Sequence, residues 1–325
     1  MCQGIQEYDG TSAASNLVRV YKHLSFAVAR SMCSAARRRR VEAFNAERKR
    51  QLQRYSNDIE KVIITVQKED GEERHLLMNN RLSTFYDCAK HISRLKAQNT
   101  AVAHVIAESS EYFASPHTTI DGKARVELLE FNNAKFADNV NKAYWRSCAF
   151  LLGAVAECSF RANVCIIGSL PPVVESGRFV HAAAIEGLHD WKPSKAELNA
   201  LTGKVLRDFV FMALPFEPLT VERKFAADLF AENERKVEHI MKGDDANVTL
   251  YKVGGHVDVA EEPLIANTRQ IGRFAITAVD YVDSLYYFSG VSLPSAARCS
   301  SYSWDLLMEA ARSPLEPRSQ MDASL

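Results

Sequence analysis

The sequence lacks a long hydrophobic run: its 325 residues contain no stretch of 18 or more apolar residues. A helix that crosses a membrane needs about 20 such residues, so we expect no membrane span. Paired cysteines are also missing, because the seven cysteines are scattered and no Cys-X-X-Cys spacing occurs. This pattern excludes a disulfide framework or a zinc knuckle and is typical of reduced thiols in an intracellular protein.

Acidic residues are absent between residues 10 and 41, where arginines and lysines alternate with apolar residues. Residues 1–40 hold seven Lys and Arg against two acidic residues, although the whole chain has 40 of each sign. Such an Arg-rich, Ser-rich and amphipathic segment is typical of a mitochondrial transit peptide, which we predict for residues 1–40. The alternative is a basic arm that stays on the protein and contacts nucleic acid.

The rest of the chain has the composition of a folded protein, with 47% apolar and 25% charged residues overall. These values allow a sizeable core, and the length suits two domains. A charged helix is predicted first, over residues 41–58. Its basic residues suit either a solvated surface or a phosphate backbone. They are Arg48, Lys49, Arg50 and Arg54.

A small domain is predicted for residues 59–133. Residues 61–78 form two β-type runs around a Glu-Asp-Gly turn, which is typical of a hairpin. A helix capped by Ser83 follows, and two further strands cover residues 101–107 and 124–131. Strand, strand, helix, strand, strand in this order predicts a β-grasp-like module.

A second, α+β domain is predicted for residues 140–295, and the fold class of the whole chain is therefore α+β. Helical spacing covers residues 145–157, 194–211 and 220–241, and alternating runs at 248–260 and 273–282 predict strands. Within the first of these runs, His256 and Asp258 face the same side, so we expect a hydrogen-bonded pair and no metal site. Residues 296–325 are predicted to form a C-terminal extension that ends in a loose tail.

These segments, in this order, resemble the N-terminal half of threonyl-tRNA synthetase. The motifs ITVQKEDG and STFYDCAKHI resemble its TGS domain, a β-grasp fold, and RSCAFLLG and HVDVAEEPLI resemble its α+β editing domain. The motifs VNKAYWRSCA, LPFEPLTVE, VDVAEEPLIANT and FSGVSLP are also similar to a family of mitochondrial large-subunit ribosomal proteins that descends from this synthetase fragment. This second resemblance covers nearly everything after residue 41.

The resemblance also implies where an editing site would lie. The editing domain uses His-X-X-X-His on a helix together with Cys-X-X-X-His on a loop, because side chains four apart on a helix converge. This chain has neither histidine nor cysteine at the four corresponding positions, so the resemblance implies a degenerate pocket. Two polar residues of the pocket, an ammonium and a carboxylate, remain and are expected to form a structural ion pair. The six positions are Arg146, Phe150, Ala260 and Leu264 for the lost residues, and Lys236 and Asp258 for the retained ones.

We therefore expect a structural protein of the mitochondrial ribosome's large subunit in the matrix, with no catalytic residue, metal or cofactor. Its expected partners are the large-subunit rRNA, contacted by the basic helix and by Arg146, and neighbouring ribosomal proteins. About thirty residues follow Pro294, too few for the catalytic sheet of a synthetase, so aminoacylation is not expected. The alternatives are a mitochondrial tRNA deacylase, which would need the missing residues, and a free TGS-type regulatory protein that binds a small ligand.

Overall fold

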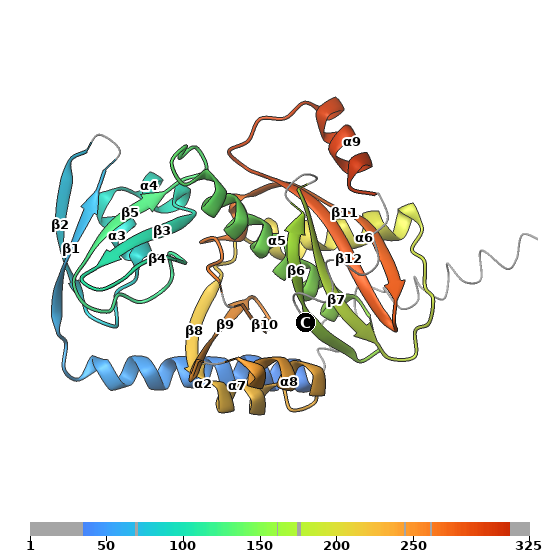
Figure 1. The fold of residues 1–325 in the computed structure, drawn as a ribbon, viewed down its shortest axis with the longest axis horizontal. Coiled ribbons are helices and arrows are strands. Elements are labelled where there is room, and N and C mark those ends of the chain that lie inside the picture. Colours follow the sequence, from blue (N-terminus) through green and yellow to red (C-terminus); the bar gives the residue numbers. More distant parts are fainter. Residues whose placement is uncertain are drawn as a thin grey trace, which may run out of the picture.

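The computed structural model describes residues 35–68, 71–160, 162–173, 177–243, 245–260 and 262–312. The first element is the long helix α2 (Ala35–Ser56), which lies along the lower side of the molecule in Figure 1. It begins six residues before the predicted start, because its first turns contact the second domain. Most of the segment predicted as a transit peptide lies outside the described residues.

The first domain is built on a mixed five-stranded sheet with strand order β2-β1-β5-β3-β4. Strands β1 and β5 are parallel, and the other neighbouring pairs are antiparallel. Two helices, α3 and α4, belong to the same unit. The elements are β1 (Lys61–Gln67), β2 (Glu73–Asn79), α3 (Phe85–Ile92), α4 (Arg94–Asn99), β3 (Val102–Ala107), β4 (Glu111–Ala114) and β5 (Ala124–Leu129).

The helix of this domain differs in two details from the sequence prediction. The cap is Thr84, not Ser83: the Thr84 hydroxyl accepts from the Asp87 backbone N–H, and the Asp87 carboxylate accepts from the Thr84 N–H. The helix also ends at Ile92, and Ser93 caps a separate helix, α4. Ser93 has an extended backbone, because its side chain competes for the N–H groups of the following turn.

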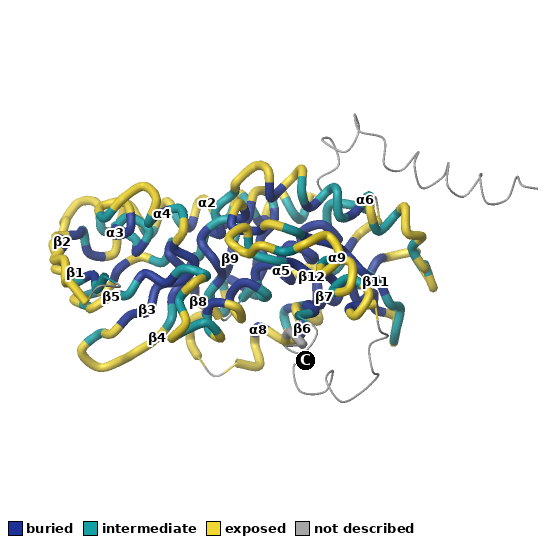
Figure 2. The backbone as a smooth tube through the Cα atoms, turned by 90° about the horizontal axis from the view of Figure 1, so that it is seen from above, coloured by how far each residue is buried: buried dark blue, intermediate teal, exposed yellow. Residues whose placement is uncertain are grey.

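The second domain is centred on helix α5 (Ala137–Ser159), which is buried without interruption over residues 147–156 (Figure 2). A four-stranded antiparallel sheet with strand order β11-β12-β7-β6 packs on it. Its strands are β6 (Val164–Val173), β7 (Arg178–Ile185), β11 (Ile271–Val282) and β12 (Leu285–Pro294). Helix α6 (Lys195–Val205) covers the same face beside α5 and continues into a π-helical turn over Leu206–Val210.

A smaller sheet lies next to helix α2, with strand order β10-β9-β8. It consists of β8 (Glu217–Glu222), β9 (Asn247–Val253) and β10 (His256–Val259). Helices α7 (Arg223–Leu229) and α8 (Glu234–Lys242) separate β8 from β9. The single helix predicted for 220–241 is therefore wrong: its first residues form the end of β8, and Asn233 caps a new helix.

The C-terminal part of the described chain contains a helix that the sequence did not reveal. After a short 3₁₀ turn (Thr268–Gln270) and strands β11 and β12, helix α9 (Ser301–Ala310) begins at a Ser300 cap. The chain at Ala311, just after α9, packs on Ala275 and Val291, on the sheet face opposite α5, because side chains alternate along a strand. The tail predicted from residue 313 onward lies outside the described residues.

The two domains share one core. Ala101, Val102 and Leu129 of the first domain belong to the same buried cluster as helix α5. The Gln270 side-chain amide donates to the Thr100 carbonyl at 2.8 Å and to the Gln98 carbonyl at 3.2 Å. These contacts fix the small domain against the larger one.

The α+β class predicted from the sequence is confirmed. No helix within the described ranges is long and apolar enough to cross a membrane. The identity of the two units as TGS-like and editing-like domains remains a prediction.

Candidate functional site: a filled pocket and a basic helix

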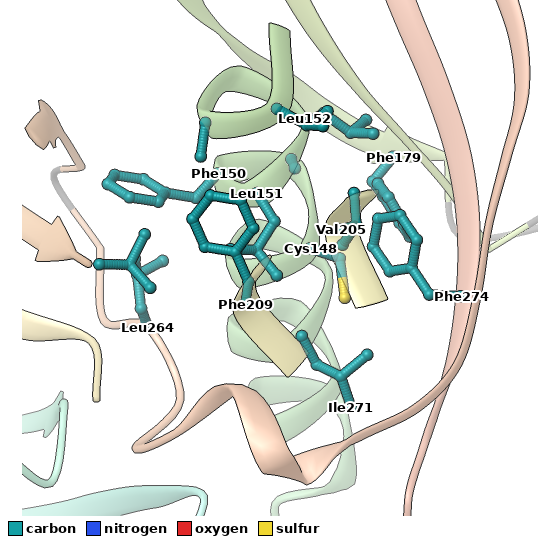
Figure 3. Packing of buried hydrophobic residues seen from close by; sticks show 14 of the residues in the cluster. Cys148, Phe150, Leu151, Leu152, Phe179, Val205, Phe209, Leu264, Ile271 and Phe274 are labelled. Carbon is teal, nitrogen blue, oxygen red and sulfur yellow. The ribbon is translucent and has the colours of Figure 1, made fainter. Parts of the chain in front are cut away.

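Helix α5 places Arg146 and Phe150 one turn apart, as the spacing predicts. Phe150 is 2% exposed, and its ring makes edge contacts with Phe216, Tyr251 and His256. Leu264 is 1% exposed and lies on the same flank of α5 (Figure 3). Phe150 and Leu264, at two positions where the resemblance implies lost ligands, therefore pack within the hydrophobic core.

The loop after β10 is held tightly against α5. Ser147 Oγ accepts from the Ile265 backbone N–H at 2.9 Å and donates to the Ala143 carbonyl at 2.7 Å. The Leu264 N–H points to the Tyr251 hydroxyl at 3.4 Å. Ala260, at the former cysteine position, packs on the same hydrophobic core. The loop is thus held by hydrogen bonds to Ser147 and Tyr251 and by apolar packing.

Arg146 lies at the edge of this filled pocket. Its guanidinium is 3.4 Å from the Glu262 carboxylate, and its side chain is 26% exposed. Burial lowers the Arg146 pKa, although a guanidinium still stays protonated at physiological pH. Its Nε is buried and makes no hydrogen bond within the described ranges. Arg146 is therefore a half-buried cation that cannot act as a base.

Lys236 and Asp258 form an ion pair of 2.7 Å in which both side chains are 2% exposed. Burial disfavours the charged form of Asp258, but Lys236, aided by His256 and His181, holds the carboxyl pKa below its usual value. The Asn233 side chain fixes the first turn of α8: it accepts from the Lys236 N–H and donates to the Ile166 carbonyl. This pair is enclosed on all sides and is not open to a ligand.

His181 lies in the same buried region. Its Nδ1 is 3.0 Å from Ser169 Oγ, and burial lowers its pKa to about 3, so it is neutral at physiological pH. Its ring packs directly on Gly153 of α5, where a Cβ atom would lie 2.6 Å from two ring atoms. Gly153 is therefore required for this close approach, and His181 acts as a packed core residue.

His256 and Asp258 face the same side of β10, but they do not bond to each other as expected. His256 Nδ1 lies 2.7 Å from the Glu157 carboxylate, whereas Asp258 pairs with Lys236. Glu157 also pairs with Arg40 of helix α2. The sequence analysis missed this network, because Arg40 and Glu157 are 117 positions apart.

The region around α5 offers few side chains that could bind a metal ion or act as a nucleophile. Among the described residues, no group of three His, Cys, Asp or Glu side chains could hold a metal ion. Burial raises the pKa of the Cys148 thiol to about 12, so this cysteine is a poor nucleophile. This region therefore provides packing and internal ion pairs.

The four basic residues predicted to contact RNA, all on α2, fall into two groups. Arg48 pairs with Glu217, and Arg50 pairs with Glu47 at 2.7 Å. Lys49 and Arg54 are exposed, and neither forms an ion pair within the described ranges. Only the second group keeps its charge available for a phosphate backbone.

Comparison with known proteins gives a consistent pattern. No protein-family model matches the chain. It is 29% identical over 296 residues to large ribosomal subunit protein mL39 of Drosophila melanogaster, covering 88% of this chain and 86% of that protein. The chain is a relative of mL39. This match covers most of both proteins.

More distant relatives are aminoacyl-tRNA ligases. The chain is 27% identical over 281 residues to the probable cytoplasmic threonine–tRNA ligase 1 of Dictyostelium discoideum, which covers 84% of this chain. It is 28% identical over 245 residues to the mitochondrial threonine–tRNA ligase of Mus musculus. It spans only 37% and 30% of these two ligases, whereas it spans most of mL39.

Proposed function

We propose that this chain is a non-catalytic structural component of the large subunit of the mitochondrial ribosome, located in the matrix. The observation that carries the proposal is the match to mL39, a large ribosomal subunit protein, over 88% of this chain and 86% of that protein. The filled pocket supports it, because Phe150 and Leu264 occupy positions where the resembling enzymes need ligands and proton carriers.

The proposal includes the identity of the two domains. The mixed five-stranded sheet with helices α3 and α4 corresponds to a TGS-like domain over residues 59–133, and the α5-centred unit to an editing-like domain over 140–295. The partial matches to threonine–tRNA ligases support this assignment. In both domains the fold is retained as a rigid surface for neighbouring ribosomal proteins.

Contact with rRNA is proposed for two places. Lys49 and Arg54 on α2 offer unpaired positive charge to phosphates, which suits a local, sequence-independent contact. Arg146 presents a half-buried guanidinium that lies 3.4 Å from the Glu262 carboxylate. A net charge of zero for the whole chain favours such local contacts, with proteins sharing the remaining anchorage.

The tRNA deacylase alternative has little support in the geometry. A deacylase needs a base or a metal-bound water beside the ester, and the former ligand positions hold Arg146, Phe150, Ala260 and Leu264.

Sedimentation tests the proposal directly. In a mitochondrial extract on a sucrose gradient, we expect the protein to migrate with the large subunit and to move to the top after RNase treatment or magnesium chelation. Migration at the top in the untreated extract would overturn the structural assignment, and deacylase and ligand-binding assays would then follow.

The basic helix provides a sharper prediction. The double variant Lys49→Ala/Arg54→Ala should weaken binding to total mitochondrial large-subunit rRNA and lower the slope of log affinity against log salt by about 2. Filter binding at several salt concentrations measures both quantities.

The matched control is Arg48→Ala/Arg50→Ala, which removes the same number of charges from the same helix. These arginines are already paired with Glu217 and Glu47, so the salt slope should change little. Equal effects of the two double variants would show that α2 does not contact RNA through Lys49 and Arg54.

A further inference from the structure

The first turns of α2 carry four consecutive arginines, residues 37–40, and three of them contact the second domain. Arg37 Nε donates to the Gly255 carbonyl at 2.7 Å, and Arg39 pairs with Glu232 at 2.7 Å. Arg40 pairs with Glu157, with the two side chains only 7% and 4% exposed. The arginines are therefore part of the folded structure.

Glu157 depends on this contact. It lies near the end of the buried helix α5, and burial alone would favour its neutral form. His256, Arg40 and Arg37 together outweigh burial and hold the Glu157 pKa below its usual value. The Arg40 guanidinium also lies 5.2 Å from the centre of the Phe230 ring. Without α2, the carboxylate would lose Arg37 and Arg40 and keep His256.

The second domain leaves space for the Arg37 side chain at Gly255. A Cβ at Gly255 would lie 2.7 Å from the Arg37 guanidinium, so the β9–β10 turn leaves space for this side chain. The Gly255 carbonyl, the buried Glu157 carboxylate and the space beside Gly255 thus form a contact surface for the start of α2. If processing removed these arginines, this surface would lose its partner, and the buried Glu157 carboxylate would lose its arginine partners.

We infer that Arg37 and Arg40 are a permanent clamp between α2 and the second domain, and that the cut which releases the import segment lies before Arg37. The position of the cut rests on the proposed mitochondrial function; the clamp does not. Processing is hydrolysis of one peptide bond by a matrix endopeptidase: water supplies the hydroxyl of the new carboxyl end and a proton of the new amino end.

Two chains of different length test the clamp. We expect the protein that begins at Ala35 to melt at least about 10 °C above the protein that begins at Val41, because the shorter chain lacks both arginines. Replacing Glu157 by Gln in the shorter chain should recover part of this difference, since it removes the unpaired charge. Equal melting temperatures of the two chains would overturn the clamp.

Point variants separate the clamp from a general loss of helix. In the chain that begins at Ala35, Arg40→Ala should lower the melting temperature, whereas Arg38→Ala, at an exposed position of the same turn, should not. A similar loss for both variants would overturn the assignment to Arg40.

Mass spectrometry of the N-terminus of the protein from purified mitochondria tests the cut. A first residue between positions 2 and 37 supports the inference, and a first residue after Arg37 overturns it. A protein that still carries residue 1 would overturn the processing step, while the melting data decide on the clamp. The two parts therefore fail in distinguishable ways.

Discussion

Replacement of Lys236 by alanine should lower the free energy of unfolding by about 3–5 kcal/mol, because it leaves Asp258 charged, buried and unpaired. The ion pair is 2.7 Å long, and each side chain is 2% exposed, so water cannot replace the lost partner. Chemical denaturation of the purified variant, followed by circular dichroism, measures the difference.

Lys242→Ala is the matched control, because Lys242 lies on the same helix. Its pair with Glu238 is 3.4 Å long and more than 60% exposed on both sides, so the loss should stay below about 0.5 kcal/mol. A Lys236→Met/Asp258→Leu variant, which removes both charges, should be much closer to the natural protein. Comparable losses for Lys236→Ala and Lys242→Ala would refute the buried pair.

Phe150→Ala should destabilise the protein by about 3–5 kcal/mol, because the ring fills the former pocket and a cavity would remain. The ring contacts Phe216, Tyr251 and His256, and these neighbours belong to three different segments that cannot readily move together. Thermal and denaturant unfolding measure the loss.

Phe211→Ala provides the comparison, since Phe211 is 73% exposed and its removal creates no cavity. We expect a change within about 0.5 kcal/mol. If Phe150→Ala were as mild as Phe211→Ala, the pocket would be an open cavity and the deacylase and ligand-binding alternatives would regain weight.

Local sequence patterns predicted much of the fold. The alternation in residues 61–78 and the helical spacing in 145–157 were sufficient, because each burial pattern repeats along one element. The break at Ser93 was not predictable in the same way: the helical spacing continues across it, and one side-chain cap decides the boundary. The C-terminal helix α9 was missed because none of its own residues is fully buried.

The prediction of the candidate site residues rested on the resemblance to a known family more than on composition. The relationship to the ribosomal protein and, more distantly, to the ligases is confirmed by the comparisons. Lys236 and Asp258 were expected to pair, and the structure places them 2.7 Å apart. Glu157 and Arg40 could not be found from spacing, because their contact depends on how two distant helices pack.

The shared core between the two domains also affects the order in which parts of the chain can complete their folding. The Gln270 amide satisfies the Thr100 and Gln98 carbonyls, about 170 positions earlier in the chain. Ala101, Val102 and Leu129 likewise bury against α5 and its sheet. During synthesis or passage through a membrane pore, the N-terminal domain is delivered first, yet its Thr100 and Gln98 carbonyls lack this partner until Gln270 arrives. The chain therefore needs protection along most of its length before it becomes one cooperative unit.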